Sequence, residues 1–162
     1  MKTLVLLFLA CTCTINMLAN EITGKVITVI DGNTLEVTSS NNEIYKIILA
    51  GIDSPELNQN FGDEARKRLE KLTLNKNVTV KIIGKDRLGN RLAEVMIDGK
   101  SDPRIVLLKE GLAWTTERDP LPDLEAYRTK AQQKGKGLWT QSDPTPPWIF
   151  RRQQTMLQPK SS

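Results

Sequence analysis

The chain has 162 residues, of which 39% are apolar and 26% charged, and this composition predicts one globular domain. The net charge of +4 is compatible with a polyanionic partner but does not require one. Histidine is absent and the two cysteines, Cys11 and Cys13, both lie near the N-terminus, so we expect neither a zinc site nor a nucleotide cofactor.

Residues 1–19 differ in kind from the rest of the chain. Lys2 is followed by an apolar run over residues 4–10 and then by small and polar residues up to Ala19, which is typical of a secretory signal peptide. A buried N-terminal helix or a membrane anchor is the alternative, although the run is short for a membrane span. We therefore predict export to the periplasm or the medium, with no stable membrane insertion after the signal is removed.

The next part of the chain alternates short β-branched runs with turn residues, which is typical of antiparallel strands. Three such runs cover residues 25–30, 34–38 and 43–49. The period changes over residues 62–72, where Ala65 and Leu69 share one face and charged residues occupy the other. The sequence therefore predicts three strands followed by an amphipathic helix.

Strand alternation resumes after this helix. Residues 78–83 and 92–97 flank a turn and predict a hairpin-like pair. A helix is predicted over residues 103–111, because the segment begins with a proline and stops at a glycine. Another is predicted over residues 123–134, with Asp123 as its cap.

These elements predict a fold that is mainly β with α (α+β). We expect an OB-fold-like five-stranded barrel with about three helices, the first of them inserted after the third strand. Beyond Trp139, the prolines within residues 144–147 predict a packed strap, and residues 153–162 predict a disordered tail. The predicted domain therefore covers residues 20–152.

Two acidic clusters, each at the end of a predicted strand, form the candidate site. They are Asp31-Gly32-Asn33-Thr34 and Asp53-Ser54-Pro55-Glu56. Carboxylates at strand ends can converge across a barrel, and oxygen ligands of this kind suit Ca²⁺ or Mg²⁺. Either cluster alone is more often a turn, so the hypothesis of a cation site depends on both.

Seven short blocks extend this pattern over nearly all of residues 24–152. They are Gly24-Lys25-Val26, Ile30-Asp31-Gly32-Asn33-Thr34, Leu49-Ala50-Gly51-Ile52-Asp53-Ser54-Pro55-Glu56, Gly62-Asp63-Glu64-Ala65, Asp86-Arg87-Leu88-Gly89-Asn90-Arg91-Leu92-Ala93, Gly111-Leu112-Ala113-Trp114 and Gly137-Leu138-Trp139. In content and order they are similar to the staphylococcal nuclease (thermonuclease) family. The resemblance implies calcium-dependent hydrolysis of phosphodiester bonds in DNA and RNA.

The resemblance also implies roles for individual residues. Asp31 and Asp53 match acidic residues of the family's metal site, and Asn33 falls on a third. Ser54 matches a metal-site position that contributes its backbone carbonyl. Glu56 matches the acid that orients or deprotonates the attacking water.

Three positions depart from the family's pattern. The second metal-ligand aspartate of the family is Asn33 here, which removes a charge and implies weaker calcium binding. The family's two arginine positions fall on Ile48 and Asn90, and a catalytic arginine is worth about 10³ to 10⁵ in rate. Lys46 and Arg91 are candidate replacements, although lysine lacks the bidentate fork and a solvated charge is the simpler interpretation of both.

Two functions therefore remain open. One is an exported nuclease whose activity is weakened or lost. The other is a non-catalytic OB-type module that binds single-stranded nucleic acid or an extracytoplasmic protein. DNA or RNA, in single-stranded form, is the expected partner of the first. Three tryptophans are expected to pack helices and the strap against the barrel, and the pair Arg151-Arg152 is interpreted as solvated tail charges.

Overall fold

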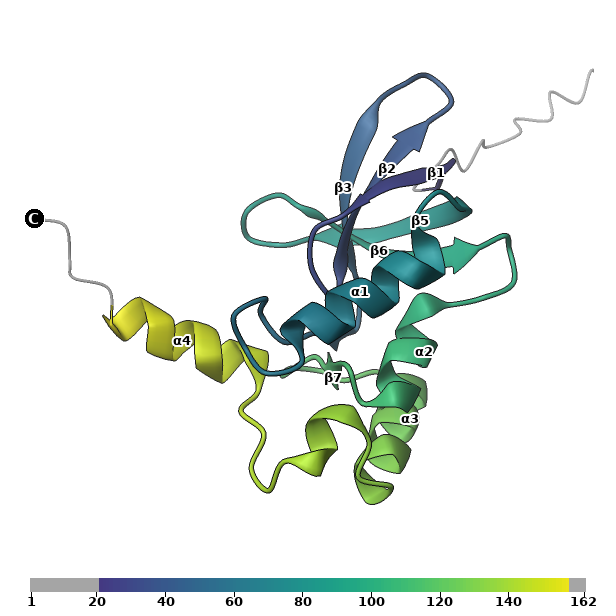
Figure 1. Cartoon of the computed structure of the whole chain (residues 1–162). Coiled ribbons are helices and arrows are strands. Elements are labelled where there is room, and N and C mark those ends of the chain that lie inside the picture. Colours follow the sequence, from purple (N-terminus) through teal and green to yellow (C-terminus); the bar gives the residue numbers. More distant parts are fainter. Residues whose placement is uncertain (1–20, 158–162) are drawn as a thin grey trace, which may run out of the picture.

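The computed structural model describes residues 21–157, so the predicted signal peptide lies outside the described residues. Five strands close into a barrel in the order β1-β2-β3-β6-β5 (Figure 1). They are β1 (Glu21–Val29), β2 (Thr34–Ser39), β3 (Ile44–Leu49), β5 (Asn77–Lys85) and β6 (Arg91–Ile97). All neighbours are antiparallel except β3 and β6, whose parallel pairing closes the barrel. The predicted fold class is confirmed.

The barrel interior is filled by apolar side chains from alternate strand positions. Val26, Val37, Leu49, Val80 and Val95 are fully buried there. Burying a valine or leucine contributes about 1.5–3 kcal/mol relative to exposure, so the alternation drives closure of the sheet.

Helix α1 (Gly62–Thr73) packs across the barrel, as its amphipathic pattern predicts (Figure 1). Its residues Ala65 and Leu69 are fully buried in the core, while the charged face is in contact with water. The loop before this helix carries the second acidic cluster, so the packing of α1 fixes one side of the candidate site.

The remaining helices follow β6 in the chain. It contains α2 (Pro103–Glu110), α3 (Pro122–Gln133) and the 3₁₀ helix η1 (Gly137–Thr140). A two-residue strand, β7 (Trp114–Thr115), pairs with β4 (Ile52–Asp53). Helix α3 starts at Pro122 without a side-chain cap, so Asp123 is a first-turn residue and not the predicted cap.

A fourth helix, α4 (Pro147–Leu157), was not among the three that the sequence predicted. Two prolines open it, and no glycine or proline interrupts residues 148–157. Residues 153–157, which the sequence assigned to the tail, therefore form its last turns. The helix extends away from α2 and α3 (Figure 1). Within residues 21–157, no helix combines the length and apolarity needed to span a membrane.

Candidate functional site

The first acidic cluster forms the turn between β1 and β2. The backbone N–H of Asn33 donates to Asp31 Oδ1 at 2.9 Å, which is the local bond that aspartate favours in turns. The Asn33 carbonyl accepts the N–H of Leu49, on β3, at 2.8 Å. The turn is therefore anchored to the neighbouring strand.

The second acidic cluster is tied directly to the first. The Ser54 N–H donates to Asn33 Oδ1 at 3.2 Å, and the Ser54 hydroxyl donates to the Gly32 carbonyl at 3.0 Å. A Cβ at Gly32 would lie only 2.6 Å from the Ser54 Cβ, so glycine permits this approach. The structure thus brings together two segments that are 21 residues apart.

The loop before α1 and the first residue of that helix hold the backbone of Glu56 in place. The Gln59 N–H donates to the Glu56 carbonyl at 2.8 Å, and Gln59 Oε1 accepts the Glu56 N–H at 3.2 Å. A Cβ at Gly62, the first residue of α1, would lie 1.9 Å from the Glu56 carbonyl oxygen. The Glu56 side chain is 37% exposed, so it is positioned by its backbone and still reaches solvent.

Arg151, on α4, contacts both acidic side chains of the second cluster. Its Nη1 donates to Asp53 Oδ1 at 3.0 Å and to Glu56 Oε1 at 2.7 Å, and its Nη2 donates to Asp53 Oδ2 at 2.7 Å. The sequence interpretation of Arg151 as a solvated tail charge is therefore wrong. Nearly one hundred residues separate it from its partners, and local patterns carry no signal for such a contact.

The environment of Asp53 opposes its ionisation. Burial raises the pKa of the Asp53 carboxyl, and the nearby charges of Glu56 and Asp31 raise it further, while Arg151 acts in the opposite direction. The hydrogen bond to Asp53 is the main reason why the pKa of Arg151 is raised. Asp53 is therefore subject to repulsion from two carboxylates, Glu56 and Asp31, and to attraction by one guanidinium.

Lys46 and Ile48 lie on the same strand, β3. Lys46 is exposed and pairs in register with Glu36 of β2. Ile48 is half-buried and pairs with Thr34, the last residue of the first acidic cluster. Among residues 21–157, Lys46 has no ion pair with an acid of the site. The apolar side chain of Ile48 thus lies close to the acidic loops without supplying charge to them.

Asn90 and Arg91 occupy the turn between β5 and β6 and the start of β6. The Asn90 side chain donates to Asp86 Oδ2 at 2.8 Å, which closes the turn and lowers the pKa of Asp86. The Arg91 guanidinium stacks over the Tyr45 ring, 4.8 Å from its centre. In the described part of the chain, neither side chain contacts Glu56 or Asp53.

The donor set is suited to a hard cation but is partly engaged. Asp31 and Asp53 supply carboxylate oxygens of the type that calcium prefers. The Asn33 amide oxygen already accepts from Ser54, and both Asp53 oxygens accept from Arg151. Among the described residues, no three His, Cys, Asp or Glu side chains are grouped to hold a metal. Asp31 and Asp53 therefore offer two carboxylates of the kind that fits a calcium ion, with water as the further ligand. Such a site binds calcium more weakly than a site with three carboxylates.

The tryptophans pack as the sequence predicts. Trp114 lies edge-to-face with Trp139 at 4.4 Å between ring centres and with Trp148, on α4, at 5.7 Å. Trp148 therefore attaches α4 to β7, the strand that pairs with Asp53. This contact places Arg151 over the site.

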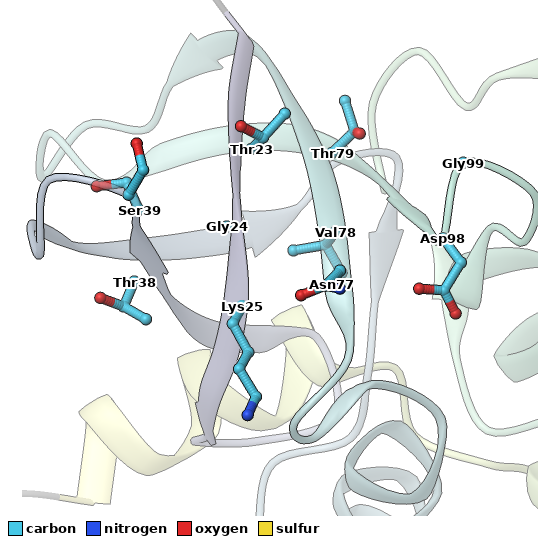
Figure 2. A pocket seen from close by; sticks show the side chains of 11 residues that line it. Thr23, Gly24, Lys25, Thr38, Ser39, Asn77, Val78, Thr79, Asp98 and Gly99 are labelled. Carbon is cyan, nitrogen blue, oxygen red and sulfur yellow. The ribbon is translucent and has the colours of Figure 1, made fainter.

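A separate hollow of about 500 Å³ lies over β1 (Figure 2). Gly24 lines it, and a Cβ at this position would lie 2.3 Å from the Thr38 carbonyl oxygen of the neighbouring strand. Polar side chains such as Thr23, Asn77 and Asp98 line it. None of the site residues predicted from the sequence borders this hollow, so it is distinct from the acidic site.

Comparisons with known proteins agree with this architecture. The family model described as "Staphylococcal nuclease homologue" matches residues 46–141. A protein of Escherichia coli O157:H7 named "Uncharacterized endonuclease" is 35% identical over 136 residues, which are 83% of this chain and 88% of that protein. A Haemophilus influenzae protein of the same name is 38% identical over 135 residues, 82% of this chain and 74% of its own. The "Micrococcal nuclease" of Shigella flexneri is 31% identical over 140 residues, 80% of each chain.

Proposed function

This chain belongs to the staphylococcal nuclease family, and from that premise we propose that it is a calcium-dependent phosphodiester hydrolase of low activity. The observation that carries the proposal is the contact of one arginine, Arg151, with both Asp53 and Glu56. Hydrolysis of a phosphodiester needs a general base that activates water and a positive charge that stabilises the phosphate oxygens. Protein side chains can supply both at one site.

Glu56 is the proposed base. It takes a proton from water, the water oxygen bonds to phosphorus, and the phosphorus–oxygen ester bond breaks as the leaving oxygen takes a proton from solvent. Calcium, when bound, would be held by Asp31 and Asp53 and would stabilise charge on the phosphate oxygens. Asn33 lowers the charge available to that ion, which supports the proposal of low activity.

Single-stranded DNA or RNA is the proposed substrate, because barrels of the OB type bind single strands along their surface grooves. Export is proposed from residues 1–19, whose charge and apolar run are typical of a signal peptide. Determining the N-terminal sequence of the protein in periplasmic and culture fractions tests this. Recovery of the intact N-terminus from the cytoplasm alone would rule export out.

The first prediction concerns Glu56. We expect Glu56→Gln to lower calcium-dependent release of acid-soluble nucleotides from single-stranded DNA by about 10² to 10⁴-fold, the usual value of a general base. Glu64→Gln makes the same chemical change on the exposed side of α1 and should retain the wild-type rate. Wild-type protein that releases no nucleotides with calcium, even at high protein concentration, would contradict the proposed hydrolysis.

The second candidate function is a non-catalytic module that binds single-stranded nucleic acid or an extracytoplasmic protein. The engagement of both Asp53 oxygens by Arg151 favours it, because these hydrogen bonds compete with a cation for the same oxygens. Salt-sensitive oligonucleotide binding that Glu56→Gln leaves unchanged, without nucleotide release, would support the nucleic-acid form. No binding at low salt would leave the protein partner.

A further inference from the structure

The guanidinium of Arg151 binds two acids through Nη1 and Nη2, and its Nε–Nη2 edge has no acceptor among residues 21–157. Both hydrogens of Nη1 are used, one by Asp53 and one by Glu56, and Nη2 gives a single hydrogen to Asp53. The Nε hydrogen and the second Nη2 hydrogen lie on one edge of the planar group. Within residues 21–157 these two have no acceptor, and the side chain is 48% exposed.

This free edge has the shape of a phosphate receptor. Two parallel N–H groups of arginine match two oxygens of a phosphate, which a lysine ammonium does not do. Glu56 Oε1 lies 2.7 Å from Nη1, on the opposite side of the guanidinium from this edge, so Arg151 would link the proposed base to the phosphate across its own planar group. The positive charge would also offset the repulsion between the phosphate and the three carboxyl groups.

We propose that Arg151 is the phosphate-binding arginine of this site. Its Nη1 hydrogens and one Nη2 hydrogen hold Asp53 and Glu56, and its Nε hydrogen and second Nη2 hydrogen hold the non-bridging oxygens of a nucleic-acid phosphodiester. This inference rests on the proposed function and deepens it. Positions 48 and 90 carry no arginine in this chain, and α4 supplies a guanidinium from a different direction.

Three contacts keep α4 in the position that this role requires. Trp148 packs on Trp114, Arg152 Nη2 donates to Glu117 at 2.8 and 3.0 Å, and the Gln59 amide donates to the Thr145 carbonyl before the helix. Gln59 also contacts Glu56, so the loop with the base and the segment before α4 are linked. Arg151 is thus held by its neighbours as well as by its own ion pairs.

The test measures fluorescence anisotropy of a labelled single-stranded oligothymidylate in EDTA, where no cleavage occurs, over a series of salt concentrations. Arg151→Ala should weaken binding about tenfold or more. The same substitution should reduce the slope of the logarithm of the binding constant against the logarithm of the salt concentration by about one, as the loss of one phosphate contact does. The affinity of Arg151→Lys should lie between those of wild type and Arg151→Ala, because lysine keeps the positive charge but lacks the two parallel N–H groups. Arg118→Ala removes an exposed guanidinium that does not contribute to the docking of α4; it is the matched control and should bind like wild type.

An oligothymidylate with uncharged methylphosphonate linkages provides the second arm, and wild type and Arg151→Ala should bind it equally. Wild-type affinity of Arg151→Ala for the charged oligonucleotide would overturn the inference. An equal loss in Arg118→Ala would overturn it too, since the loss would then reflect total positive charge and not the position of Arg151. Nucleotide release at saturating calcium is measured in parallel, and its absence in wild type would contradict the hydrolysis without deciding the binding result.

Discussion

Asn33 has two roles at the residue scale, because one amide replaces a carboxylate and also joins the two acidic loops. Its Oδ1 accepts the Ser54 N–H, and an aspartate oxygen could accept the same bond. The connection between the loops therefore does not require an amide. What the amide changes is the charge presented to a cation.

We accordingly predict that Asn33→Asp tightens calcium binding without disturbing the fold. A third negative group near Asp31 and Asp53 raises the charge of the donor set, and charge is one determinant of calcium affinity. Isothermal titration with calcium measures the effect. Asn42→Asp, in the β2–β3 turn, adds the same charge away from the site and should leave the affinity unchanged. Equal affinities of Asn33→Asp and wild type would contradict the assignment of this position to the cation site.

A residue of the site could be predicted from the sequence when it belongs to a short local motif. Asp31, Asp53 and Glu56 stand in short motifs at strand ends, and such motifs can be recognised in the sequence. Arg151 has no motif of its own, because its contacts come from the packing of α4 and not from spacing along the chain. Lys46, by contrast, was a candidate replacement for the arginine position at Ile48 because it lies two residues away on the same strand face, and the structure places it in solvent.

At the scale of elements, the contact between α1 and the Glu56 loop sets the position of the proposed base. Gly62 lies where a Cβ would be 1.9 Å from a backbone oxygen, and a backbone atom cannot give way as a side chain can. The first turn of the helix is therefore built around the absence of a side chain. This explains a glycine in a helix, where it is otherwise unfavourable.

Gly62→Ala is predicted to lower the free energy of unfolding by about 1–3 kcal/mol, the usual cost of overpacking. It should also reduce nucleotide release, because relief of the clash moves Glu56. Urea denaturation and the release assay measure the two effects. Gly84→Ala, in β5, adds the same methyl group where nothing lies within 4 Å and should leave both unchanged. An unchanged stability of Gly62→Ala would show that the loop is not fixed by α1.

Strands and helices were predicted as well as their periodicity allows. The alternation over β1, β2 and β3 and the apolar face of α1 determine which side chains are buried, and they are visible in a single sequence. The two-residue pair of β4 and β7 is not visible, because it is formed by tertiary contact alone. Helix α4 was missed since prolines were interpreted as a strap, although they begin the helix.

On the scale of the whole molecule, the site depends on α4 and the core does not. The buried clusters of the core contain no residue of this helix, whose one buried residue is Pro147. The site, however, takes its guanidinium from α4. The barrel and the complete site are therefore separable parts of the molecule.

A chain that ends at residue 146 is thus predicted to fold. Its free energy of unfolding should fall by no more than about 3 kcal/mol, the upper value for burial of one large side chain such as Trp148. Its affinity for single-stranded oligonucleotides should equal that of Arg151→Ala. Thermal unfolding followed by circular dichroism and anisotropy measure these outcomes. A truncated chain that is unfolded would show that α4 belongs to the core.

The order of the elements along the chain has a consequence for biosynthesis. A ribosome makes the barrel and both acidic loops before it makes α4. A nascent chain that has not reached residue 151 therefore carries the acidic loops without the guanidinium that the proposed phosphate site needs. The proposed site is thus completed only after the barrel that supports it has been synthesised.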